Sequence, residues 1–129
     1  MIERNSRWRW LFLGKGTWNC LITTLLWFTE TRGAGDPTLL WISRQMFLAL
    51  CFVFGLGYLS VGQDVTQNHG IVRLGILGQL SVALIAGAHF LAGNLTGMRL
   101  VAAGVDLICA GAFALFLSRY RYRLQFEGL

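Results

Sequence analysis

The sequence has little proline and little charge. One proline occurs in 129 residues, and 13% of the residues are charged, whereas a soluble domain of average composition carries roughly 25%. The few charges are also clustered, which leaves long apolar stretches between them. This composition excludes an ordinary soluble domain and indicates an integral membrane protein.

Several chemical signatures are also missing. The three cysteines form no CxxC pair, and each lies inside an apolar segment, so we interpret them as small packing residues. The sequence contains no zinc signature, no nucleophile triad and no glycine-rich phosphate loop. We therefore predict no catalytic residue and no metal site, and we expect that the protein is not an enzyme.

What the sequence does contain is four apolar stretches. A membrane-spanning helix needs about 20 mostly apolar residues, and stretches of this kind cover residues 11–29, 38–61, 71–91 and 98–118. The connections between them are short, so neighbouring helices are expected to be antiparallel. The sequence predicts an all-α protein with a single transmembrane domain over residues 1–129, a four-helix up-down bundle.

The basic residues indicate topology rather than nucleic-acid binding. The formal net charge is +5, but arginines flank the apolar segments: Arg4, Arg7 and Arg9 precede the first, and Arg119, Arg121 and Arg123 follow the last. Because cytoplasmic ends of membrane helices are enriched in Lys and Arg, both termini are expected to be cytoplasmic. The expected partners are lipid headgroups, with no nucleic acid.

The N-terminus also has features of a signal peptide, because charged residues precede an apolar run. That run continues to Thr29, longer than the roughly 7–15 apolar residues of a signal sequence. A retained first helix is the favoured interpretation, although the small residues Gly33, Ala34 and Gly35 leave cleavage open.

Each expected helix carries one strong polar residue near the same depth. These four residues form a predicted intramembrane polar layer: Asn19, Arg44, Gln79 and Asp106. Asp106 lies about 15 Å into the last helix at 1.5 Å per residue, and Arg44 is the cation expected to pair with it. The layer has two explanations: it fixes helix register, or it forms a site for an ion, a proton, a quinone or a lipid headgroup.

His89 is the one candidate ligand for a haem or a chlorophyll-type pigment, although a lone histidine near a membrane edge is more often an interfacial residue. The only other histidine, His69, lies at the opposite end of the same expected helix, which excludes a bis-histidine haem within one chain. We predict no cofactor, and contact with a lipid, a quinone or a pigment stays open.

The second half of the chain resembles a known group of proteins. Gly55, Gly57 and Tyr58 are followed by Asp64 and His69 in a short polar loop, then by LGILG and later by VDLI. This pattern resembles small, uncharacterised four-helix bacterial membrane proteins with a DoxX-like architecture. The resemblance implies a multi-pass protein of the bacterial cytoplasmic (inner) membrane. Where that group often has Lys in the third helix, this chain has Gln79.

The expected function is that of an accessory, assembly or structural subunit of a larger membrane complex, of the respiratory or photosynthetic type. Gly104 and Gly111 lie roughly opposite Asp106, flanked by Ile108 and Leu115. This face either accepts a helix of another integral membrane subunit or of a second copy, or simply contacts lipid. The alternative is a DoxX-like carrier or membrane redox protein that uses the polar layer.

Overall fold

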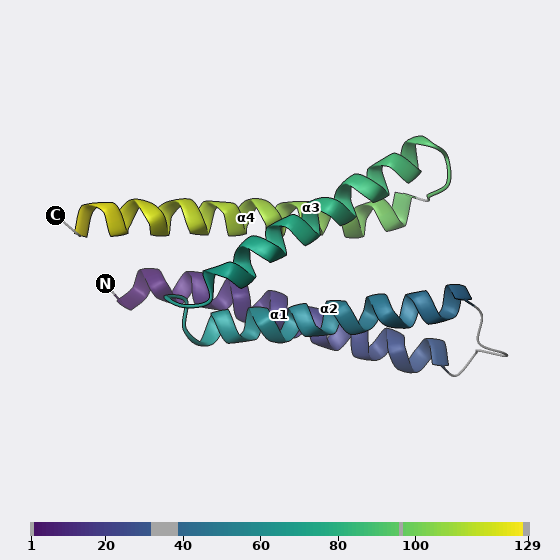
Figure 1. Cartoon of the computed structure of the whole chain (residues 1–129), viewed down its shortest axis with the longest axis horizontal. Coiled ribbons are helices and arrows are strands. Elements are labelled where there is room, and N and C mark those ends of the chain that lie inside the picture. Colours follow the sequence, from purple (N-terminus) through teal and green to yellow (C-terminus); the bar gives the residue numbers. More distant parts are fainter. Residues whose placement is uncertain (1, 32–38, 96, 128–129) are drawn as a thin grey trace. The chain divides into compact units, whose positions relative to one another are not determined.

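The computed structural model describes residues 2–31, 39–95 and 97–127, and Figure 1 shows its helices. Four helices follow one another along the chain: α1 (Ile2–Thr31), α2 (Leu39–Gln63), α3 (His69–Leu91) and α4 (Gly97–Glu127). The prediction of an all-α protein with four helices is confirmed. Helices α1 and α4 extend beyond the expected spans, because charged residues end an apolar segment without ending a helix.

Three helices are long and apolar enough to cross a membrane. The apolar segments are Ile42–Gln63, His69–Leu91 and Leu100–Tyr120. Within the described ranges, α1 is not among them, since Lys15 and Asn19 interrupt the apolar run of residues 11–29. The fourth span therefore stays a prediction, as do the up-down arrangement and the sides on which the termini lie.

The chain divides into two compact units, Met1–Ile71 and Val72–Leu129. The first contains α1 and α2 and the start of α3, and the second contains the rest of α3 and α4. The two units are described separately below.

Helices α1 and α2 lie side by side in the first unit (Figure 1) and touch at glycines. A Cβ placed on Gly16 would lie 2.8 Å from the carbonyl oxygen of Gly55 and 2.8 Å from the backbone nitrogen of Leu59. A Cβ on Gly55 would lie 2.7 Å from Cys20 Sγ. The two backbones are therefore so close here that Gly16 and Gly55 leave no room for a side chain of their own.

The register of this contact is antiparallel and regular. Leu13 faces Gly62, Gly16 faces Leu59 and Cys20 faces Gly55, so residue numbers rise along α1 as they fall along α2. The spacing of three and four residues on each helix is that of a heptad seam. Each glycine receives a larger side chain of the other helix, and small residues of this kind let membrane helices approach closely. We call this contact the glycine seam.

The connection between α2 and α3 is held by its own side chains. The Asp64 carboxylate accepts hydrogen bonds from the backbone N–H and the hydroxyl of Thr66, and from the Gln67 amide at 2.8 Å. Asn68 adopts a positive φ of 59°, a conformation that asparagine tolerates better than most residues. His69 Nε2 forms a 2.9 Å hydrogen bond with the Val65 carbonyl.

The end of α3 is a Schellman cap. The Asn94 N–H donates to the His89 carbonyl at 2.9 Å, and the Gly93 N–H donates to the Phe90 carbonyl at 3.0 Å. Gly93 has a φ of 75°, which glycine adopts without the steric cost of a Cβ. The chain therefore leaves α3 abruptly before α4 begins at Gly97.

The glycine seam predicts opposite effects for two nearby glycines of α1. Gly16→Ala places a methyl group against backbone atoms of α2, and we expect it to lower the free energy of unfolding by about 1–3 kcal/mol. Gly14→Ala is the matched control, because no described residue lies within 4 Å of its Cβ position, and it should be neutral or stabilising by up to about 1 kcal/mol. Thermal unfolding of both variants in detergent measures this difference, and equal midpoints would contradict the seam.

The Asp64 turn predicts a pH dependence. Hydrogen bonds from the Thr66 hydroxyl, the Thr66 backbone N–H and the Gln67 amide hold the pKa of the Asp64 carboxyl below its ordinary value of 3.8. Because the pKa is lowered in the folded state, the ionised carboxylate stabilises the turn at pH values above the ordinary pKa. This stabilisation is lost as the pH falls through the folded-state pKa. An NMR titration of the Thr66 amide should give a midpoint below 3.8, and Asp64→Asn should abolish the transition. A midpoint above 3.8 would show that the bonds do not form.

Candidate functional site

On α1, the predicted polar layer is represented by Asn19, and Thr23 follows it one turn later. Thr23 is buried, and its hydroxyl donates to the Asn19 carbonyl at 2.6 Å and to the Cys20 carbonyl at 3.3 Å. Asn19 is half-buried, and its Cβ lies 3.1 Å from the Cβ position of Gly55. Asn19 therefore lies directly at the glycine seam, and the Thr23 hydroxyl is satisfied within α1.

On α2, the buried polar residue is Gln45 rather than Arg44. Arg44 is exposed, whereas Gln45 is only 8% exposed. Gln45 Nε2 is buried without a hydrogen-bond partner among the described residues. An unsatisfied buried donor costs about 1–3 kcal/mol, so Gln45 destabilises the first unit unless another group supplies an acceptor.

The sequence analysis did not select Gln45, although a signal for it was present. Gln45 and Leu48 continue the three- and four-residue spacing that leads through Phe52 to Gly55 and Leu59 of the glycine seam. A residue at such a position faces the partner helix. The prediction chose Arg44, one residue earlier, because Arg44 is charged.

Within the first unit, the structure separates Asn19 from Arg44. Asn19 lies beside Gly55, and Arg44 precedes Gly55 by eleven residues, which is about 16 Å along a helix. The two residues therefore lie at different levels of the α1–α2 pair. Gln79 and Asp106 belong to the second unit, so the Arg44–Asp106 pair and the layer as a whole stay predictions.

In the second unit, the surroundings of Gln79 and Asp106 differ. Gln79 is only 7% exposed, whereas Asp106 is half-buried. Asp106 lies nine residues after the start of α4 at Gly97, about 14 Å along the helix. Next to it at helical spacing, Ala103 and Ala110 are buried. Small buried residues therefore lie beside Asp106 on that side of α4.

The other face of α4 carries two glycines. Among the described residues, none lies within 4 Å of the Cβ positions of Gly104 and Gly111. Between them, Ile108 is 74% exposed, and Leu115 one turn further on is 46% exposed. We call these four residues the open glycine face of α4.

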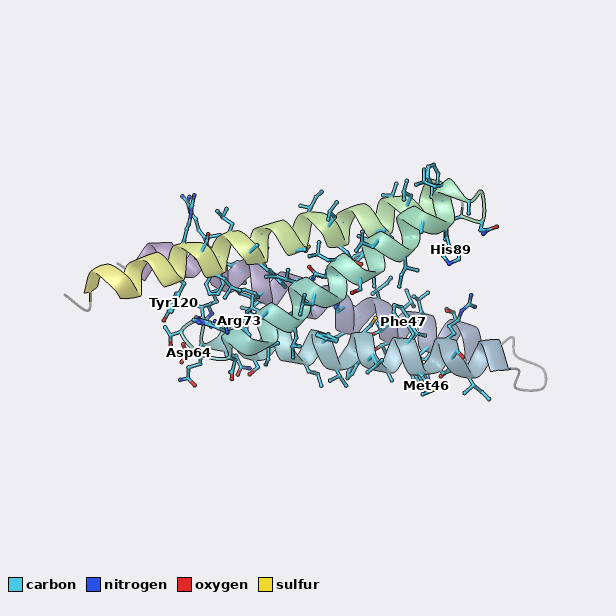
Figure 2. All side chains as sticks on the ribbon, turned by 45° about the horizontal axis from the view of Figure 1, so that its top comes forward. Met46, Phe47, Asp64, Arg73, His89 and Tyr120 are labelled. Atoms are coloured by element: carbon cyan, nitrogen blue, oxygen red, sulfur yellow. The ribbon has the colours of Figure 1, made fainter. Side chains whose placement is uncertain are left out.

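His89 lies near the end of α3 that leads into α4, and Arg73 lies near the other end (Figure 2). The His89 side chain is exposed, and its backbone carbonyl takes part in the Schellman cap. Among the described residues, no group of three or more His, Cys, Asp or Glu side chains is arranged to hold a metal ion. A pigment role for His89 stays a prediction.

The unpartnered amide of Gln45 predicts a stabilising substitution. Gln45→Leu removes a desolvated donor and keeps a side chain of similar size, so we expect it to raise the free energy of unfolding by about 1–3 kcal/mol. Thr23→Val is the control: the hydroxyl that it removes bonds to a carbonyl of its own helix, and the change should be close to neutral. Chemical unfolding in detergent compares the two variants, and a destabilised Gln45→Leu would reveal an acceptor for this amide.

Comparison of the chain with protein-family models, with curated proteins and with solved structures gives no match. The likeness to DoxX-like four-helix membrane proteins therefore rests on the sequence motifs alone.

Proposed function

We propose that the protein is a small multi-pass protein of the bacterial inner membrane and serves as an accessory or assembly subunit of a larger membrane complex. Three helices long and apolar enough to cross a membrane support the membrane assignment. The arginines before residue 11 and after residue 117 favour cytoplasmic termini. A respiratory or photosynthetic complex is the host that we propose.

The open glycine face of α4 carries the proposal of association. The glycine seam shows what glycines at this spacing do in the same chain: Gly55 and Gly62, seven residues apart with Leu59 between them, receive α1. Gly104 and Gly111 have the same separation, with Ile108 in the position that corresponds to Leu59. Small residues at such positions promote close helix packing in membranes, so this face suits a helix of a partner subunit.

The described hydroxyl groups also favour a structural role over catalysis. In the helices, Thr23, Thr24, Ser81 and Ser118 each donate to a carbonyl three or four residues earlier. A catalytic hydroxyl instead needs a neighbouring base that takes its proton. These four hydroxyls therefore contribute to helix structure, and we propose that the protein is not an enzyme.

The alternative function is a DoxX-like carrier or membrane redox protein. The observation in its favour is Asp106, a half-buried carboxylic acid inside the apolar segment Leu100–Tyr120. An ionisable residue at such a position is costly to place in a membrane and often takes part in ion, proton or ligand pathways.

Purification in mild detergent tests the leading proposal. We expect a stoichiometric membrane partner with the unaltered protein and its loss with the double variant Gly104→Leu/Gly111→Leu, whose new side chains fill the open glycine face. Gly87→Leu is the matched control, because no described residue lies within 4 Å of its Cβ position on α3 either, and it should retain the partner. Recovery of the unaltered protein without any partner would count against an accessory role.

Asp106→Asn separates the two functions. If the protein is an accessory subunit, the variant should assemble with its partner and support its host pathway at the unaltered level. A carrier or redox protein should instead insert normally and lose proton- or quinone-dependent activity, since asparagine is similar in size and cannot ionise. The activity of membrane vesicles that contain each form decides between these outcomes.

A further inference from the structure

We draw no further inference here: the strongest candidate, the apolar groove between α1 and α2 that is lined by Thr23, Trp27, Leu48 and Phe52, carries none because nothing in the structure shows what covers it.

Discussion

The backbone contact between α1 and α2 is the constraint on which the first unit depends. Gly16 and Gly55 bring the two helices so close that a Cβ on either would collide with the other helix. That approach sets the antiparallel register, and the register determines which side chains face one another further along. The buried position of Gln45 on the same face of α2 follows from it.

The same chain uses glycine in two ways. In the glycine seam, the missing side chains are replaced by Leu13, Leu59 and Cys20 of the opposite helix. On the open glycine face of α4, the same seven-residue separation of glycines receives nothing from the described residues. A membrane offers no strong hydrophobic drive for helices to associate, so close packing of small residues is one of the few available sources of affinity. This contrast is the physical basis on which we propose an accessory subunit.

Much of the fold was predictable from the sequence, because the length and placement of apolar runs determine helices almost directly. The candidate site was less predictable. Arg44 and Asp106 stand out in the sequence because they are charged residues inside apolar segments. Burial depends on how the helices pack, however, and on α2 the buried polar residue is Gln45. The separation of Asn19 from Arg44 likewise depends on the register of two helices. Counting residues from the ends of the expected spans gives the depth of each residue within its own helix. It does not give the register between two helices.

Helix α1 has a further consequence for how the protein is made. Lys15 and Asn19 make it the least apolar of the four helices, and α2, its partner in the glycine seam, is one of the three apolar ones. In the predicted four-span topology, the polar cost of placing α1 in a bilayer is partly offset by contacts that exist only once α2 is beside it. The unit of insertion would then be the α1–α2 hairpin, because the free energy of transferring α1 into the lipid phase would depend on both helices together.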